Sequence, residues 1–235
     1  MINKTKIICT IGPASSGVKV LSSLIKKGMD VARLNFSHGD RTTQLEYIHN
    51  IRMASKQTNV FIPIMQDLQG PKIRVGKLEN NSIRLLSGKK IFITDKNIIG
   101  NEYRISTTYK HFVNDVKKGE YILMDDGLLR MRIISKTVNE VECIVLKGGI
   151  LKEHKGINLP DTRLSLPSLT AKDKEDLLFG LKNNVDAVAL SFVRKADDII
   201  QLRKLITKFG KSVPIVAKVE RPEAIENIDE IIDAA

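Results

Sequence analysis

Residues 31–40, VARLNFSHGD, place four polar side chains of different chemistry at the end of an apolar run. Arg33, Asn35 and Ser37 are spaced two apart, and alternate residues of a strand share one face. His38 follows at once. A guanidinium, an amide, a hydroxyl and an imidazole together favour a site for an anion, a metal ion or both. The alternative is an internal hydrogen-bond cluster that caps the strand end.

The elements around this stretch alternate between strand and helix. Near-continuous apolar strands separated by helices are typical of a buried parallel sheet. Predicted strands cover residues 6–12, 29–36 and 60–67. The first helix carries Val18, Leu21, Leu24 and Ile25 on one face and ends at Gly28, and the second runs from Asp40 to Lys56 with Leu45, Ile48 and Ile51 inward.

The pattern changes between Gly70 and about Pro167, where short alternating strands replace helices. Apolar and polar residues alternate along residues 129–133 and 141–145, and turn signals such as Asp126-Gly127 separate the runs. This segment predicts a small all-β domain, most simply a barrel.

Strand and helix alternation then resumes to the end of the sequence. Thr170 is the expected N-cap of a helix, residues 186–192 and 213–220 are strands, and Pro222 suits the first turn of a last helix. The helix between these strands turns Ile199, Leu202, Ile206 and Phe209 to one side, and the last helix does the same with Ile225, Ile228 and Ile232.

The predicted fold class is therefore α/β, a (β/α)₈ TIM barrel with a small β-barrel inserted after the third strand. Residues 1–70 form the first part of this barrel, 71–167 the inserted β domain, and 168–235 the continuation of the barrel. Five strands are about five-eighths of a barrel that needs eight. The sequence also stops inside a helix pattern, IDEIIDAA, so we expect an incomplete barrel.

Composition narrows the function classes. The net charge of +11 fits either nucleic acid or a small, highly charged anion. Only 5% of residues are aromatic and none is Trp, and no recognition helix or Cys/His finger is evident, which argues against nucleic acid.

No run is long enough to span a membrane, and no signal peptide is evident. Cys9 and Cys143 are expected as buried free thiols of a reducing cytoplasm.

Five stretches resemble one family. TKIICTIGPAS, GMDVARLNFSHG, QDLQGPKIRVG, KGINLP and IVAKVERPEAIENI occur in this order, with a β insertion after the third strand, as in the pyruvate kinase family. The resemblance covers nearly the whole chain. It implies transfer of the phosphoryl group of phosphoenolpyruvate to ADP, giving pyruvate and ATP. Another phosphoenolpyruvate-using barrel enzyme would lack the insertion.

The resemblance assigns roles to the opening stretch. Arg33 matches an arginine on the transferred phosphate, so it is expected to bind substrate and to act in catalysis. Asn35 and Ser37 match oxygen ligands of a monovalent cation. Asn35 and His38 also belong to the nucleotide side.

The stretch QDLQGPKIRVG supplies further matches. Asp67 and the backbone carbonyl of Leu68 correspond to cation ligands, and Arg74 corresponds to an arginine on the nucleotide phosphates. Lys72 stands where potassium-dependent members carry a glutamate. Its ammonium would repel a monovalent cation nearby, so we expect potassium to be dispensable and Lys72 to replace it. The alternative is a lysine turned to solvent.

Lys218 and Glu220 share one face at the end of the fifth strand. A lysine after Ile215, Val216 and Ala217 is costly to bury without a partner, and the resemblance makes it a catalytic point charge on the phosphoryl group and the bound substrate. Glu220 is the expected ligand of Mg²⁺ or Mn²⁺. The alternative is a structural ion pair.

The β insertion contributes one further match, and the fourth strand two weaker candidates. The resemblance implies that the inserted β domain acts as a lid over the nucleotide. Lys155 matches a lysine of that lid that contacts the nucleotide phosphates, although a lysine beside a turn glycine is often merely solvated. Ser191 and Arg194 are supporting residues at the end of the fourth strand.

The resemblance also sets the expected context. The partners are phosphoenolpyruvate and ADP or ATP, in the cytoplasm, with a homotetramer for the full-length protein. Family members take a second Mg²⁺ carboxylate from beyond the equivalent of Ala235. A catalytically inactive fragment is therefore the alternative function.

Overall fold

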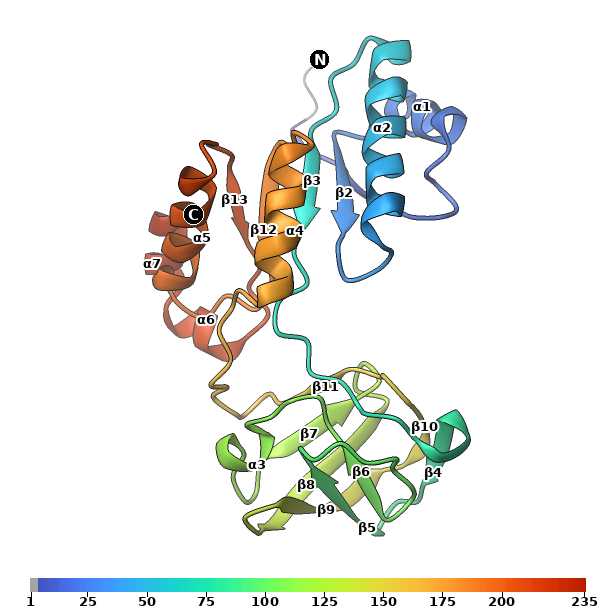
Figure 1. Ribbon diagram of the computed structural model, residues 1–235, viewed down its shortest axis with the longest axis vertical. Coiled ribbons are helices and arrows are strands. Elements are labelled where there is room, and N and C mark those ends of the chain that lie inside the picture. The colour runs from blue at the N-terminus through green and yellow to red at the C-terminus, as the bar shows by residue number, and fades with distance from the viewer. Residues whose placement is uncertain (1–3) are drawn as a thin grey trace. The chain divides into compact units, whose positions relative to one another are not determined.

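The computed structural model describes residues 4–235. It divides into two compact units (Figure 1). Unit 1 combines residues up to Pro71 with residues Pro167–Ala235, and unit 2 is Lys72–Leu166. The chain therefore leaves unit 1 after the third strand of that unit and returns to it about a hundred residues later.

Unit 1 is built on a five-stranded parallel sheet in the order β1-β2-β3-β12-β13. Its strands are β1 Ile8–Ile11, β2 Val31–Asn35, β3 Ile64–Asp67, β12 Ala187–Leu190 and β13 Ile215–Ala217. The register places Asn35 beside Asp67, and Asp67 beside Ala189. Because all strands run in one direction, their carboxyl ends lie along a single edge of the sheet.

A helix follows each of these strands and packs its apolar face on the sheet. The helices are α1 Val18–Lys26, α2 Arg41–Thr58, α4 Ala171–Lys182, α5 Ala196–Lys208, α6 Pro222–Glu226 and α7 Ile228–Ala234. Leu34 and Phe36, between the polar residues of β2, join the buried core. Five consecutive βα units of a (β/α)₈ barrel are thus present, which confirms the predicted fold class.

Helix caps account for several boundaries. The Asp40 carboxylate accepts a hydrogen bond from the Thr43 amide and starts α2. Thr170 and Asp173 form the reciprocal contacts of a capping box at the start of α4. Gly28, with φ of +103°, follows α1 in a conformation that other residues rarely adopt.

Three details of the sequence prediction were wrong. Leu45 is exposed, and α2 buries Gln44 and Tyr47 beside Ile48 instead. The third strand begins only at Ile64, and Phe61 before it is 69% exposed. The last helix is two helices broken at Asn227, whose amide donates to the carbonyls of Arg194 and Glu223.

The break at Asn227 also changes which face is buried. Ile225 and Ile232 are exposed, and Ile231 is the fully buried residue of α7. The predicted stripe assumed one continuous helix, and the break rotates the residues that follow it.

Unit 2 consists almost entirely of strands around a second core. A six-stranded sheet has the order β11-β7-β8-β9-β5-β6, and β10 pairs with β4 in a separate two-stranded sheet. The strands are β4 Ser82–Leu85, β5 Lys90–Thr94, β6 Arg104–Ser106, β7 Tyr121–Met124, β8 Leu129–Lys136, β9 Glu140–Lys147, β10 Gly149–Lys152 and β11 Ile157–Asn158; short helices η1 Glu79–Asn81 and α3 Phe112–Asp115 complete it. The alternating residues of β8 and β9 point inward as predicted.

The two thiols differ in their surroundings. Cys143 is buried in unit 2, and burial raises the pKa of its thiol to about 12, so it stays a neutral core residue. Cys9 is only half-buried, which departs from the prediction. Within residues 4–235 no helix has the length and apolar character needed to cross a membrane.

Gly180 of α4 tests how closely this helix packs on β3. A Cβ atom built there would lie 2.2 Å from Oε1 of Gln66, a side chain with no exposed surface. We expect Gly180→Ala to lower the free energy of unfolding by about 1–3 kcal/mol, because overpacking outweighs the gain in helix propensity. Urea denaturation measures the change.

Gly12→Ala is the matched control for that substitution. A Cβ at Gly12 meets nothing within 4 Å, and its φ lies outside the left-handed region. The control should change the unfolding free energy by less than about 0.5 kcal/mol. Equal stabilities of the two variants would contradict the close packing of α4 on Gln66.

Candidate functional site

The carboxylate of Asp67, the last residue of β3, is the centre of the candidate site. Arg33 donates to its Oδ2 atom from Nε at 2.8 Å and from Nη2 at 2.5 Å. Lys218 reaches both Asp67 oxygens at 3.2 Å. Two cations predicted to bind phosphate, from β2 and from the end of β13, are thus held by one anion.

Lys218 makes two further contacts, so its ammonium has a fixed position. It donates to Oγ of Ser191 at 2.9 Å and lies 3.1 Å from Oε1 of Glu220. Ser191 in turn donates to the backbone carbonyl of Leu68 at 2.6 Å. The ends of β3, β12 and β13 are therefore joined through the Lys218 side chain.

Glu220 is oriented by backbone as well as by Lys218. The amide of Phe192 donates to Oε2 of Glu220 at 3.1 Å, and Phe192 has φ of +56°. Such a left-handed conformation in a bulky residue is uncommon and costs about 1–3 kcal/mol, a strain that clusters at functional sites. The backbone here is bent in a way that directs an amide at the Glu220 carboxylate.

Gly70 permits the close approach of the loop after β3 to Ser191. A Cβ at Gly70 would lie 2.8 Å from the Phe192 ring and 3.1 Å from the Ser191 Cβ, and φ there is +68°. The Gly70 amide also donates to the buried Asp173 carboxylate of α4. Only glycine fits this position without strain in the backbone or displacement of the Phe192 ring.

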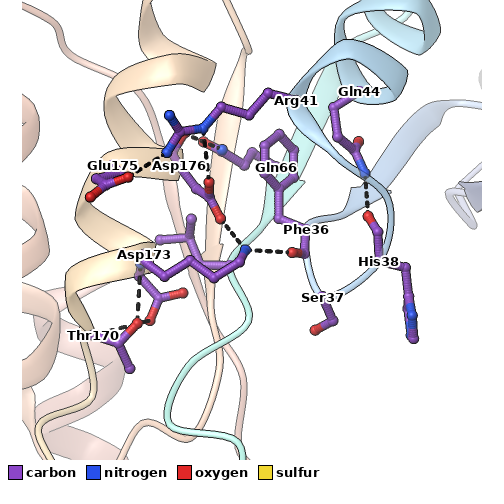
Figure 2. Close-up of polar contacts among 12 residues, drawn as sticks. Phe36, Ser37, His38, Arg41, Gln44, Gln66, Thr170, Asp173, Glu175 and Asp176 are labelled. Atoms are coloured by element: carbon purple, nitrogen blue, oxygen red, sulfur yellow. Dashed lines mark hydrogen bonds and ion pairs between the residues drawn. The ribbon is translucent and has the colours of Figure 1, made fainter.

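The turn after β2 holds the other predicted residues. Oδ1 of Asn35 accepts from the Ser37 amide at 2.9 Å, which folds the chain back just beyond the strand. The His38 imidazole points away from α2 and α4 (Figure 2). Asn35 lies beside Asp67 in the sheet register. The turn therefore adjoins the group formed by Arg33, Asp67, Ser191, Lys218 and Glu220, which we call the Asp67 cluster.

Unit 2 brings two other predicted residues together. Arg74 pairs with Gly156 in an isolated bridge and donates from Nη1 to the carbonyl of His154 at 2.8 Å. Lys155 lies 2.7 Å from the Asp125 carboxylate, and that hydrogen bond raises the pKa of the Lys155 ammonium. Arg74 and Lys155 therefore belong to two segments that are paired in unit 2. Lys72 begins this unit.

Exposure separates the members of the Asp67 cluster. The Asp67 side chain is 2% exposed, whereas Arg33, Lys218 and Glu220 retain 26%, 27% and 36%. A buried anion that anchors partly open cations leaves donor groups for an incoming anion. A purely structural ion-pair cluster, the alternative considered from the sequence, does not require that openness.

Two contacts of this cluster were not foreseen. Thr10 at the end of β1 accepts a 2.6 Å hydrogen bond from Nη1 of Arg33. Ser191 was expected only as a support, yet it contacts Lys218, Asp67 and Leu68. Polar residues at strand ends were the available signal for both. The Arg194 amide donates to the Asp198 carboxylate of α5 at 2.9 Å, and the Arg194 guanidinium lies 4.0 Å from the same carboxylate.

The donor set can be tested against the metals that the resemblance implies. Within residues 4–235 no three His, Cys, Asp or Glu side chains are grouped to hold a metal ion. Glu220 nevertheless fits Mg²⁺, because Mg²⁺ usually takes one or two carboxylates and completes its shell with water and substrate oxygens. A partly open carboxylate with unused lone pairs meets that need.

The same test disfavours a monovalent cation. Asn35 Oδ1 and the Leu68 carbonyl each accept one hydrogen bond from the chain itself and keep one lone pair, so the charge around Asp67 decides this test. Asp67 is already neutralised by Arg33 and Lys218, so a further cation beside it would meet two like charges. The residues present do not fit potassium in this arrangement.

Fold and site together define a class: a β/α-barrel protein whose strand ends carry cations, a carboxylate and a hydroxyl arranged for phosphate chemistry. Residues 2–235 match the family model described as the pyruvate kinase barrel domain. The chain belongs to the pyruvate kinase family, which confirms the resemblance.

Individual relatives agree with this assignment. A pyruvate kinase of Geobacillus stearothermophilus is 44% identical over 238 aligned positions, and one of Staphylococcus saprophyticus is 43% identical over 237. Each alignment covers 100% of this chain and 40% of the relative, so the chain spans about two-fifths of their length. The crystal structure of a Cryptosporidium parvum pyruvate kinase superposes with a TM-score of 0.93 at 38% identity, covering 99% of this chain and 49% of that one.

Proposed function

We propose that this protein transfers the phosphoryl group of phosphoenolpyruvate to ADP, forming pyruvate and ATP. The observation that carries the proposal is the pairing of Arg33 and Lys218 on Asp67 at the carboxyl edge of the sheet. Two cations held a few ångströms apart match the charge of a phosphoryl group with its three peripheral oxygens. We expect this glycolytic reaction in the cytoplasm, and a homotetramer for the full-length protein stays a prediction.

Electrostatic stabilisation is the main contribution we assign to these residues. Lys218, held by Asp67, Ser191 and Glu220, is preorganised as a point charge on the phosphoryl group in flight. Arg33 can present two N–H groups to phosphate oxygens, which orients the phosphoryl group as well as balancing its charge. Both cations need only exchange part of their contact with Asp67 for contact with substrate.

The bond changes balance without an added oxidant or reductant. The P–O bond to the enol oxygen breaks, and a P–O bond to the terminal phosphate oxygen of ADP forms. The enolate that remains takes up a proton and becomes the ketone of pyruvate. Mg²⁺ at Glu220 would neutralise phosphate oxygens when bound.

On the nucleotide side we propose Asn35 and His38 in unit 1 and Arg74 and Lys155 in unit 2. Arg74 and Lys155 are supported by their common location beside Gly156 and by the retained charge of Lys155. The lid function of unit 2 remains part of this proposal.

Potassium independence is the second element of the proposal. Lys72 follows Gly70-Pro71, where it supplies a positive charge in place of a carboxylate. The pairing of the Asp67 carboxylate with Arg33 and Lys218 supports the same conclusion. Asn35, Ser37, Asp67 and Leu68 would then be a weak cation site or none.

The test is pyruvate formation by the 235-residue chain and by any longer protein that carries it. Phosphoenolpyruvate, ADP and Mg²⁺ are supplied with potassium or with tetramethylammonium at equal ionic strength, and reactions without ADP are the control. We expect ADP-dependent pyruvate at rates that differ less than about twofold between the salts. Pyruvate formation in neither protein would overturn the proposed activity, and a large potassium requirement would overturn the role of Lys72.

A further inference from the structure

The first turn of α4 contacts the turn that carries Asn35, Ser37 and His38. Lys172 donates from Nζ to the backbone carbonyl of Phe36 at 2.9 Å. The backbone amide of Phe36 donates to the Asp67 carbonyl at 3.0 Å. Both polar groups of the Phe36 main chain are therefore fixed, one by β3 and one by a lysine that is 136 positions away in sequence.

An anion holds the Lys172 side chain in place. Asp176, one helical turn further along α4, is 5% exposed at its side chain and pairs with the Lys172 ammonium. Arg41 at the start of α2 lies 3.5 Å from the other Asp176 oxygen and 2.8 Å from Glu175 (Figure 2). Asp176 thus links α2 and α4 beside the turn, and it directs Lys172 toward Phe36.

A second side chain fixes the far end of the same turn. Gln44 of α2 donates from Nε2 to the His38 carbonyl at 2.8 Å and to the Asn35 carbonyl at 3.3 Å. Carbonyls on both sides of Ser37 are therefore engaged by neighbouring helices (Figure 2). The Lys172 contact is the one that comes from α4, and it is charge-assisted, which makes it stronger than a neutral hydrogen bond.

We propose that Lys172 is a positioning residue, which orders the Asn35–His38 turn for nucleotide binding. The inference rests on the proposed function, because that function assigns Asn35 and His38 to the nucleotide. Arg33 and Lys218 are anchored on Asp67 and do not depend on the Lys172 contact. Loss of Lys172 should therefore weaken ADP binding while phosphoenolpyruvate binding stays unchanged.

The experiment replaces Lys172 with methionine, which keeps the length of the side chain and removes its ammonium. Lys174→Met, an exposed lysine of the same helix, is the matched control. For Lys172→Met we expect the KM for ADP to rise about three- to tenfold, the scale of one ordinary hydrogen bond, because Lys172 acts on the nucleotide only through the turn. The KM for phosphoenolpyruvate should change by less than about twofold, and Lys172→Arg should restore ADP binding in part.

Two outcomes would overturn the inference. An unchanged KM for ADP in Lys172→Met would show that the contact does not order the turn. Equal rises in both KM values, together with a lowered Tm, would assign Lys172 to folding alone.

Amide hydrogen exchange at Ser37 and His38 tests the positioning separately from activity. Exchange should be faster in Lys172→Met than in the unsubstituted protein or in Lys174→Met. If the unsubstituted protein forms no pyruvate but this difference appears, the proposed function fails and the ordering of the turn stands. If exchange is equal in all three proteins, the inference itself fails.

Discussion

Replacing Lys218 with methionine is expected to lower kcat for phosphoryl transfer by about 10²–10³-fold, the loss seen when one preorganised charge or donor is removed from a transition state. Lys218 is the cation with the most fixed position in the site, since Asp67, Ser191 and Glu220 all contact its ammonium. A charge held in this way needs little reorganisation as the phosphoryl group moves. The Lys218 charge therefore stabilises the transition state more than it stabilises the bound substrate.

Lys218→Met should lower the Tm of the protein far less than it lowers kcat. After the substitution Asp67 keeps its two hydrogen bonds from Arg33, so no buried anion is left unpaired. Lys204→Met, at an exposed lysine of α5, is the matched control and should leave kcat unchanged. Steady-state kinetics at saturating substrates, with Tm recorded for both variants, give the comparison. A Lys218→Met variant that retains more than about a tenth of kcat would remove Lys218 from the catalytic role.

The spacing of residues 31–37 was sufficient to predict which side chains share a face. Alternation placed Arg33 and Asn35 on the face opposite Leu34, and the observed strand has the apolar residues buried and the polar ones half-open. The βα order likewise predicted a parallel sheet, whose carboxyl ends meet at one edge. Local periodicity and strand direction thus determine the location of the site.

The partners within the site could not be derived from local pattern. Asp67 pairs with Arg33 across 34 positions and with Lys218 across 151. Such pairings depend on register between strands, which periodicity does not specify. The resemblance supplied the role of Asp67 as a cation ligand, whereas the geometry shows its carboxylate occupied by Arg33 and Lys218.

Errors in the fold prediction have a common physical origin. Leu45, Phe61 and Ile225 are apolar residues at plausible spacing that remain exposed. Periodicity identifies apolar faces, but the core selects among them through contacts that are distant in sequence. Gln44 illustrates the converse, because a buried glutamine is stabilised by two backbone carbonyls of the preceding turn.

Replacing Asp67 with asparagine is expected to lower the free energy of unfolding by about 2–4 kcal/mol, a large effect for one atom exchanged. The carboxylate is almost fully buried and pairs with both Arg33 and Lys218. Removing one partner of a buried ion pair costs about 3–5 kcal/mol, and the lower range here reflects the water that reaches the two partly exposed cations. Glu175→Gln, at the exposed Arg41 pair, is the control and should cost less than about 1 kcal/mol.

Added inorganic phosphate distinguishes this electrostatic account from a simple packing defect. In Asp67→Asn, Arg33 loses its carboxylate partner and Lys218 keeps only Glu220, so phosphate should bind between the two cations and raise Tm more than in the unsubstituted protein, since a ligand of the folded state stabilises it by mass action. Thermal unfolding with phosphate and with chloride at matched ionic strength measures the difference. An equal phosphate effect in both proteins would contradict the pairing of Arg33 and Lys218 on Asp67 as the source of stability. A greater effect in the variant would confirm that the Asp67 carboxylate supplies the negative charge that holds Arg33 and Lys218 in the folded protein.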